Sequence, residues 1–534
     1  MGYVFGNEVK QGLLSPPTDI SDQKALGGVL GFKITLPKDW TLDISANHSR
    51  EDASYNTLTL DQTILAERVS GVDANGNPLP ANQQLNLFGN GTAQNPAALA
   101  GLMQWNLPGS AVTDNFSTSD SALLTAEGSL LTLPGGATRL AAGGEFRREE
   151  LNYATDVSRS GLYSTTDPSR TVKAAFAELN IPLVGEHNRI PGVYSLNLYG
   201  AGRWEQYSIS GPFDGAGAPN REVDFTHVSP KAGLSWFPWA ELKVRGTFGK
   251  SFRAPSLLNL FSATTGPYTS FAIVDPKNPG QGTIYPNTYF TGNPNLGPET
   301  ATSYTAGLDW KPMGSLRGLA VTLTYSRIDF DNRIANSSSY LNDPTIFFSL
   351  PGVVVRNASG QIERLNLGPV NIASMRSQSV DAQVAYGMDT RVGQLTFGAS
   401  GTYTIELEQE AGPGLPVLTL EGTQSGPERV RARSWVSWSR RGYGLSVYAN
   451  YSSSYINTDE NSVKQLGPQS VDHYTTFDLN GFYNLPRGFS VNGGVRNLTN
   501  AAFPFFNYLP SFDTRRVDLR GRIFYLEFSS KFNL

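Results

Sequence analysis

Residues 249–261 read Gly-Lys-Ser-Phe-Arg-Ala-Pro-Ser-Leu-Leu-Asn-Leu-Phe, and residues 292–304 read Gly-Asn-Pro-Asn-Leu-Gly-Pro-Glu-Thr-Ala-Thr-Ser-Tyr. An alternating apolar and polar segment leads into the first stretch, and another leads out of the second. The residues between them, 262–291, are rich in Gly, Pro, Asn and Tyr, a composition typical of a loop. The pattern therefore predicts that one strand rises, a large loop follows, and a second strand returns.

The same plan recurs along most of the chain. Short turns, such as Pro37-Lys38-Asp39 and Pro134-Gly135-Gly136, separate runs with the period-two alternation of strands that have one apolar face. About seventeen strands are predicted in this way: 25–36, 40–50, 121–133, 137–152, 171–181, 193–210, 225–237, 240–252, 301–311, 318–331, 377–386, 393–406, 430–439, 442–453, 474–484, 488–500 and 520–534.

The predicted connections alternate between two lengths. Turns of a few residues alternate with long polar loops, an asymmetry that is typical of bacterial outer-membrane barrels. A soluble sandwich or propeller has no reason to place every long loop at one end. The longest predicted loops are 51–120, 253–299 and 332–376, and two shorter ones are 409–427 and 501–519.

Aromatic residues and the last predicted strand also favour a membrane barrel. Several aromatics lie beside short turns, where a membrane-interface girdle forms, although ordinary core aromatics at strand ends would give the same pattern: Trp40, Trp236, Trp239, Trp310 and Tyr443. One face of the last strand is apolar, with Phe524, Leu526, Phe528, Phe532 and Leu534, and the other carries Tyr525, Glu527, Ser529, Lys531 and Asn533. A lipid-facing side and a wet lumen side explain both halves of this pattern.

Composition excludes several classes of protein. The 534 residues are 39% hydrophobic, 11% aromatic and only 16% charged, and their net charge of −4 gives no electrostatic case for binding nucleic acid. There is no Cys, and the four His residues are scattered without metal-ligand spacing, so we expect no disulfide, no metal site and no cofactor. No apolar run approaches the length of a membrane helix, and residues 1–7 do not resemble a signal peptide.

The strand–loop–strand segment from 249 to 304 resembles the C-terminal barrel of TonB-dependent outer-membrane receptors. The phrase Gly-Val-Arg-Asn-Leu-Thr-Asn at 494–500, the loop segment at 354–362 and the aromatic last strand resemble further parts of these receptors. The resemblance extends over residues 225–534, and the earlier hairpins agree with it by pattern alone. The residues that carry the family phrases are Phe252, Arg253, Pro255, Asn293, Pro294, Leu296, Glu299, Asn497 and Phe532.

These phrases have a physical interpretation as fold signatures. Pro255 has no backbone N–H and is expected to end strand pairing where the chain leaves the sheet. The Asn-Pro and Gly-Pro pairs at 293–294 and 297–298 are expected to form turns. Arg253 and Glu299 are expected at the rim of adjacent strands, where they either pair or remain separately solvated; an exposed pair contributes little to stability.

The sequence also departs from the family pattern. Such receptors carry, before the barrel, a plug domain and a short box that contacts the inner-membrane energy-coupling protein, and neither is found here. Seventeen strands are fewer than the 22 typical of plugged transporters. We therefore expect an all-β transmembrane antiparallel barrel over residues 25–534 that lacks its first strands, after an unassigned segment, 1–24. A truncated gene or fragment explains this pattern, with a plugless protein as the alternative.

The resemblance implies an outer-membrane receptor-transporter of a Gram-negative bacterium, and not an enzyme. It would take up a scarce nutrient such as a ferric siderophore, a vitamin or an oligosaccharide. Its expected partners are outer-membrane lipid, an extracellular small-molecule ligand and, if a plug and TonB box precede the barrel, the inner-membrane TonB complex. A passive porin-like channel or a non-functional barrel fragment is the alternative, while the scattered histidines do not suggest a hydrolase and adhesin repeats are absent.

Aromatic residues in the long loops are the candidates for ligand contact. Aromatic side chains in polar loops suit amphipathic ligands, although they can equally pack the loops against each other. The candidates are Tyr268, Tyr285, Tyr289, Phe290, Tyr340, Phe347 and Phe348.

Overall fold

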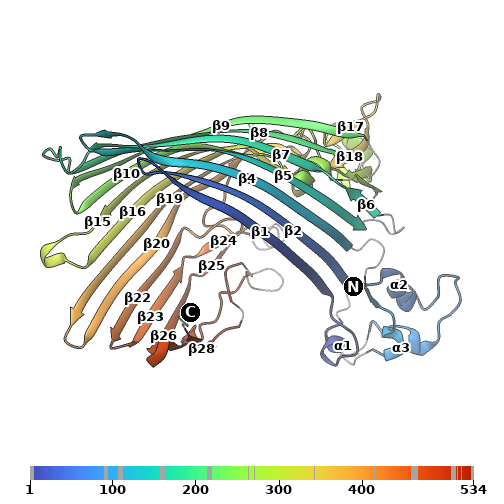
Figure 1. Cartoon of the computed structure of the whole chain (residues 1–534). Coiled ribbons are helices and arrows are strands. Elements are labelled where there is room, and N and C mark those ends of the chain that lie inside the picture. The colour runs from blue at the N-terminus through green and yellow to red at the C-terminus, as the bar shows by residue number, and fades with distance from the viewer. Residues whose placement is uncertain are drawn as a thin grey trace.

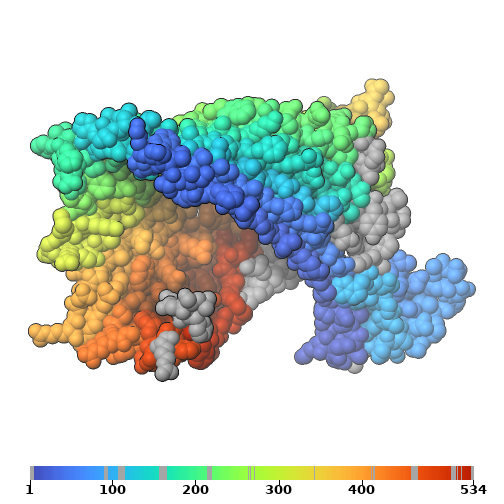
Figure 2. Space-filling view, viewed as in Figure 1, coloured from blue at the N-terminus to red at the C-terminus, as the bar shows by residue number. Residues whose placement is uncertain are grey.

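A computed structural model shows one large antiparallel sheet that curves around a hollow (Figures 1 and 2). Loops and short helices lie at its ends. The structure describes residues 5–88, 94–105, 112–156, 163–212, 219–262, 264–269, 271–341, 343–410, 412, 415–458, 467–506, 513, 515–518 and 520–530.

Seventeen long strands form the wall, and each pairs antiparallel with the next one along the chain. The predicted seventeen-stranded meander is therefore confirmed. The strands are β1 (Thr18–Leu36), β2 (Trp40–Leu60), β4 (Val112–Leu133), β5 (Gly136–Asp156), β7 (Ser169–Val184), β8 (Ser195–Pro212), β9 (Asn220–Trp239), β10 (Leu242–Arg253), β15 (Glu299–Trp310), β16 (Leu319–Asn336), β19 (Pro369–Thr390), β20 (Gly393–Glu410), β22 (Val430–Arg440), β23 (Tyr443–Ser452), β26 (Tyr474–Asn484), β27 (Phe489–Arg496) and β28 (Ile523–Ser530).

The two faces of the wall differ in polarity, as the alternation predicts. Phe524, Leu526 and Phe528 on β28 are 71%, 65% and 74% exposed on the outer face, while the intervening Tyr525 and Glu527 face the hollow. Large apolar side chains with no protein contact are costly in water and stable against lipid. The apolar face of the last strand is thus confirmed over the described residues, whereas Phe532 and Leu534 lie outside them.

Short turns lie at one end of the sheet and long connections at the other (Figure 1). The first turn is a three-residue connection, 37–39, in which Lys38 and Asp39 have φ of 61° and 54°, the left-handed geometry that tight hairpin turns use. Trp40 follows this turn, and its indole N–H donates to Ser129 O at 3.1 Å. Aromatics at the short-turn end thus anchor strand ends as well as facing outward.

Several strands are longer than the sequence predicts. The loop predicted at 51–120 is reduced to 61–111, since β2 continues to Leu60 and β4 begins at Val112; the loop predicted at 332–376 is reduced to 337–368. Strand β1 likewise begins at Thr18, inside the segment left unassigned. Beyond the apolar belt both faces of a strand are wet, so the alternation of hydrophobicity fades while the hydrogen-bonded ladder continues.

Strands β1 and β28 form the two edges of the sheet. Among the described residues β1 pairs only with β2, and β28 pairs only with β27. Each edge strand therefore presents a row of backbone groups without a ladder partner, which is costly at membrane depth.

Smaller elements occupy the long connections. Short strands β3 (Met103–Trp105), β6 (Tyr163–Thr166) and β21 (Val417–Thr419) extend the wall. Within the described ranges, helix α1 (Gly6–Lys10) precedes the first strand, and four short helices lie between strands: α2 (Gln62–Ser70), α3 (Pro96–Leu99), α4 (Leu257–Phe261) and α5 (Pro344–Phe347). No helix among the described residues is both long and apolar enough to cross a membrane.

Candidate ligand-binding site

The family-motif residues Arg253 and Glu299 lie opposite each other where β10 ends and β15 begins. Arg253 Nη1 is 3.6 Å from Glu299 Oε2, so of the two alternatives left open by the sequence the structure shows pairing, although the arginine is 76% exposed and the pair contributes little. The other carboxylate oxygen of Glu299 accepts the N–H of Ile334 at 2.8 Å. This bond satisfies a backbone group at the irregular stretch of β16, where the ladder to β19 shifts register.

The second motif forms a turn that is tied to the neighbouring strand. Asn293 Nδ2 donates to Pro369 O at 3.0 Å, and the Asn293 N–H donates to Asn259 O at 2.8 Å. Asn371 on β19 accepts from the Gly297 N–H at 2.7 Å and donates to Gly297 O at 3.0 Å. These bonds hold the chain in position as it re-enters the sheet.

Beside this turn, the motif residues help to close a small apolar cluster at the rim. Pro255 is buried, Leu296 is 2% exposed, and α4 contributes Leu260 and Phe261 to the same cluster. Phe252 packs against it, with its ring 5.4 Å from that of Tyr207 in an edge-to-face arrangement. Packing of this kind fixes the exit of the long loop from the wall.

Asn497 holds the end of β27. Its backbone φ is 50°, a left-handed conformation that Asn tolerates better than most residues, and its side chain exchanges hydrogen bonds with Ala501. Its N–H also donates to Asp478 Oδ1 at 2.9 Å. The remaining motif residue, Phe532, lies outside the described residues.

Two long loops of successive hairpins combine into one folded unit, which we call the central loop module and define as residues 264–290 and 337–367. Its sheet contains β11 (Thr265–Tyr268), β14 (Asn287–Phe290), β18 (Ile362–Leu367) and β17 (Val354–Arg356). Strands β14 and β18 pair in parallel although they come from different loops. A second pair joins β12 (Ile273–Val274) to β13 (Thr283–Ile284). The two loops are therefore interlocked.

The central loop module has its own core. Ile346, Phe347, Val353, Leu365 and Leu367 are each at most 3% exposed and pack together. A cluster of this size is what distinguishes a folded unit from two independent loops.

One buried ion pair completes the central loop module. Both carboxylate oxygens of Asp275 accept from Arg356 at 2.7 Å, and the Asp275 side chain is 0% exposed. The hydrogen bonds from Arg356, then those from Asn278 and the Lys277 N–H, hold the pKa of Asp275 well below its usual range, although burial opposes its ionisation. The carboxylate is therefore charged at every physiological pH.

The predicted ligand-contact aromatics occupy different positions in the central loop module. Phe347 is 1% exposed within the core, and the rings of Phe290, Tyr340 and Phe348 pack against that core. The ring centres of Tyr268 and Phe290 are 5.8 Å apart. Tyr289 lies 5.9 Å from the Arg364 guanidinium, and Tyr285 is 58% exposed. The structure thus brings these residues together in one module, and only Tyr285 presents most of its surface to solvent.

A second group of loops, the C-terminal loop cluster, comprises residues 420–429, 455–457, 469–471, 513 and 515–518. Strands β24 (Tyr455–Asn457) and β25 (Gln469–Val471) pair within it. Arg516 is the central residue: its Nε is 3.0 Å from Glu428 Oε1, and its Nη1 is 2.5 Å from Asp513 Oδ2. The same guanidinium donates to Thr423 O at 2.9 Å and lies 3.9 Å from the centre of the Tyr455 ring. Charges hold these loops together.

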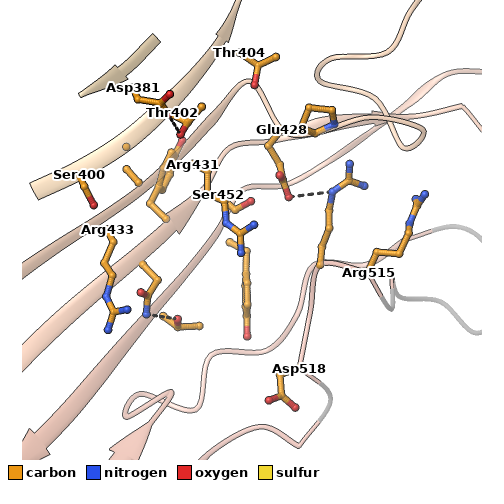
Figure 3. A pocket seen from close by; sticks show the side chains of 18 of the residues that line it. Asp381, Ser400, Thr402, Thr404, Glu428, Arg431, Arg433, Ser452, Arg515 and Asp518 are labelled. Carbon is orange, nitrogen blue, oxygen red and sulfur yellow. Dashed lines mark hydrogen bonds and ion pairs between the residues drawn. The ribbon is translucent and has the colours of Figure 1, made fainter. Parts of the chain in front are cut away.

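A cavity of about 1070 Å³ lies between this cluster and the wall. Figure 3 shows Glu428 and Arg515 on the loop segments at one side and Ser400 and Arg433 on strands at the other. Neighbouring strands contribute residues in register, so two polar rows cross the wall. The first is Asp381, Thr402, Arg431, Ser452 and Tyr474, and the second is Gln383, Ser400, Arg433, Asn450 and Thr476.

The sequence interpretation did not select these wall residues. Arg431 and Arg433 alternate with Val430 and Ala432 on a strand that was predicted correctly, so their shared face is readable from the sequence. The available signal was the repetition of a cation on the lumen side of one strand. What the sequence does not reveal is which hydroxyl and amide groups lie beside them on neighbouring strands.

The fold and site geometry agree with a known family. The family model described as TonB dependent receptor-like, beta-barrel, matches residues 5–498. The chain belongs to the TonB-dependent receptors. Members of this family are outer-membrane transport proteins of Gram-negative bacteria and not enzymes, which confirms the expected class and location of this receptor barrel.

Solved structures of such receptors share its fold. The copper transporter OprC and the unliganded ferric citrate transporter FecA both superpose with a TM-score of 0.57, at 13% and 12% identity. The alignments cover 95% and 96% of this chain but only 64% and 62% of theirs. The pyoverdine-bound receptor FpvA of Pseudomonas aeruginosa PAO1 gives a TM-score of 0.55 at 12% identity, covering 91% of this chain and 58% of that one. At these identities the comparison concerns the fold alone.

One relative is similar in sequence. The heme/hemopexin utilization protein C of Haemophilus influenzae is 29% identical over 212 residues, which are 39% of this chain and 24% of the relative. The receptor barrel thus spans less than two thirds of each of these relatives.

Proposed function

We propose that the receptor barrel forms part of a transporter that takes up a scarce nutrient across the outer membrane, with energy supplied by the inner-membrane TonB complex. The substrate classes that we consider are a ferric siderophore or other metal chelate, a vitamin and an oligosaccharide. Relatives named for haem, pyoverdine, ferric citrate and copper support a metal-containing ligand most directly.

The observation that carries this proposal is the folded architecture of the long-loop end. Loops that only screen a passive pore need no core of their own, whereas the central loop module has a buried apolar core and a fully buried aspartate that is paired with an arginine. Such preorganisation lowers the entropy lost when a ligand binds. We assign ligand recognition to this end, with Tyr285 and Tyr289 as the contact candidates and the buried Phe347 as a residue that holds the module together.

Uptake by cells tests the proposal. The source bacterium with this gene deleted is supplied in turn with a labelled ferric chelate, haem, a corrinoid or an oligosaccharide, and the same set is repeated in a strain without TonB. We expect both the deletion strain and the strain without TonB to lose uptake of one ligand. A plasmid copy of the intact gene should restore that uptake in the deletion strain. Uptake that persists without TonB would instead support the alternative, a passive porin-like channel.

Conductance provides a second, independent measurement. Purified protein inserted into a planar bilayer is expected to show no large, constant, TonB-independent conductance. A stable open pore would contradict the transporter proposal. Failure of the protein to insert at all would support the remaining alternative, a non-functional barrel fragment.

A further inference from the structure

The cavity on the wall contains two arginines without a carboxylate partner. Arg431 and Arg433 both line it, yet within the described residues neither guanidinium lies within 4.0 Å of a carboxylate oxygen or donates a hydrogen bond to the protein. Both side chains are exposed to the hollow. The five N–H groups of each arginine are therefore available to a ligand.

The nearby acids are already engaged. Asp381 Oδ1 accepts from Thr402 Oγ1 at 2.5 Å, and it lies two strands away from Arg431, or roughly 10 Å. Asp478 accepts from Asn450 Nδ2 at 2.9 Å and from the Asn497 N–H at the same distance. The lumen wall thus satisfies its carboxylates with neutral donors, and within the described residues neither arginine has a carboxylate in direct contact.

The acids and arginines of the loop side pair with one another. Arg516 contacts Glu428 and Asp513, and Arg515 contacts Asp513. Asp518 pairs with Arg520 at 2.7 Å. Of the arginines that line the cavity, Arg431 and Arg433 on β22 and Arg496 on β27 therefore have no carboxylate oxygen within 4.0 Å among the described residues, and the two on β22 share one face of one strand.

The geometry of Arg433 suits an oxyanion. Its guanidinium carbon lies 4.1 Å from the centre of the Tyr448 ring, so the ring covers one face of the planar group. A guanidinium stacked in this way keeps its N–H edge free, and that edge matches the two oxygens of a carboxylate. Arg431 is two residues away on the same face of the strand, or roughly 7 Å.

We infer that Arg431 and Arg433 form a binding site for a small polycarboxylate anion. Two cations at this spacing match a molecule with two or more separated anionic groups better than a single phosphate. Hydroxyl groups of Ser400, Ser452 and Thr476 supply further hydrogen bonds beside the arginines. A volume of about 1070 Å³ is large enough for a drug-sized ligand. That the two arginines bind a polycarboxylate does not depend on the proposed transport function. That this anion is the transported nutrient does rest on the proposed function.

Calorimetric titration of citrate into the folded 534-residue chain in detergent tests the site. Citrate supplies three carboxylates, and glucose serves as an uncharged polar probe of similar size. We expect citrate to bind, with an affinity that falls as salt is added, and glucose not to bind. Arg431→Gln and Arg433→Gln are each expected to weaken citrate binding at least tenfold, since each removes a charge-assisted contact.

Arg139→Gln is the matched control, because Arg139 is an exposed arginine on β5 that does not line the cavity. It is expected to bind citrate as the unaltered protein does. Arg433→Lys keeps the positive charge but loses the planar guanidinium, so its affinity for citrate should lie between those of the unaltered protein and Arg433→Gln. Circular dichroism must show a folded barrel for each variant that is compared. Absence of citrate binding, or an equal loss in Arg139→Gln, would overturn the inference.

A hexaglutamate peptide distinguishes two possible sources of the carboxylates, a small molecule and an acidic polypeptide segment. Tighter binding of citrate than of the peptide supports a small ligand, and tighter binding of the peptide overturns it in favour of an acidic polypeptide segment. Loss of cellular uptake with citrate binding intact would count against the transport proposal alone. Retained uptake without citrate binding would count against this inference alone.

Discussion

The central loop module and the C-terminal loop cluster both belong to loops of the barrel, but they are held together by different forces. Among the described residues, the core of the first contains seven buried apolar residues of the module together with Val370 of β19, whereas the second contributes only Tyr455 and Val471, which cluster with Phe506. Arg516 and its acidic partners replace the missing apolar contacts in the second. The difference teaches that a loop of this barrel can be ordered either by burial or by charge, and the two should respond differently to substitution, pH and salt.

The largest expected effect is the loss of Arg516. Its side chain is 11% exposed and pairs with Glu428 and Asp513, which are 10% and 4% exposed, so Arg516→Gln removes the cation beside the largely buried Glu428 and leaves Asp513 with Arg515 alone. We expect the local free energy of opening to fall on the order of 3–5 kcal/mol. Hydrogen exchange of residues 420–429 measures this loss, and Arg520→Gln, which removes an exposed pair, is the control.

Truncation of the apolar core tests the other half of the comparison. Leu365 is 0% exposed, and Leu365→Ala is expected to destabilise the central loop module by about 2–5 kcal/mol through lost contacts and a cavity. Leu418→Ala, at a position that is 45% exposed, should change little. Faster hydrogen exchange in 337–367 but not in 420–429 is the expected outcome. Equal acceleration of both regions would show that they open as one unit, which would remove the contrast.

Acid should separate the two regions with a smaller effect. Burial opposes ionisation of Asp513, but hydrogen bonds from Arg515 lower its pKa overall, and the pKa of Asp275 is lowered more strongly by Arg356. Because both folded-state pKa values lie below the unfolded value of about 3.9, each carboxylate stabilises the fold above that pH, and the contribution is lost as the pH falls through the folded-state pKa.

As the pH falls below about 3.9, the C-terminal loop cluster should therefore lose protection from exchange first, with the central loop module following only at lower pH. Exchange measured along a pH series, after correction for the intrinsic rate, checks this order. Asp275→Asn should abolish the acid step of the central loop module and leave that of the C-terminal loop cluster unchanged. The reverse order of loss would contradict the assignment of charge as the main force in the C-terminal cluster.

The smallest effect is expected at the family-motif pair. Arg253 is 76% exposed, so Arg253→Gln should change stability by less than about 1 kcal/mol, in contrast to Arg516→Gln. Glu299→Ala should cost more than Arg253→Gln, because it removes both the ion pair and the buried oxygen that accepts the Ile334 N–H. Thermal unfolding of the two variants in detergent gives the comparison. Equal losses would indicate that the ion pair matters more than the backbone contact.

The wall of this receptor was predictable because strand alternation and turn chemistry are local signals. Short turns such as Lys38-Asp39 were located correctly, while the ends of β2 and β4 were not, since their polar extensions carry no alternation. The loop interior was beyond local signals. The parallel pairing of β14 with β18 joins segments more than seventy residues apart, and no nearby residue indicates it.

Side-chain roles in the loops were harder to predict than positions. Phe347 was interpreted as a candidate ligand contact, and the structure places it in an apolar core, because an aromatic in a polar loop serves binding and packing equally well until its neighbours are known. Arg431 and Arg433 illustrate the converse. Their strand was predicted, but their lack of acidic partners follows only from the register of four neighbouring strands.

The strictly sequential pairing of the wall strands has a consequence for how such a barrel changes in evolution. Each strand hydrogen-bonds to its neighbours in the chain, so an inserted or deleted hairpin disturbs only the two ladders that flank it. The remaining strands can keep their register and their inward and outward faces. A wall built in this way can be lengthened or shortened by duplication two strands at a time. The pairing of β14 with β18, in contrast, joins loops of different hairpins, so removal of either hairpin eliminates that pairing completely.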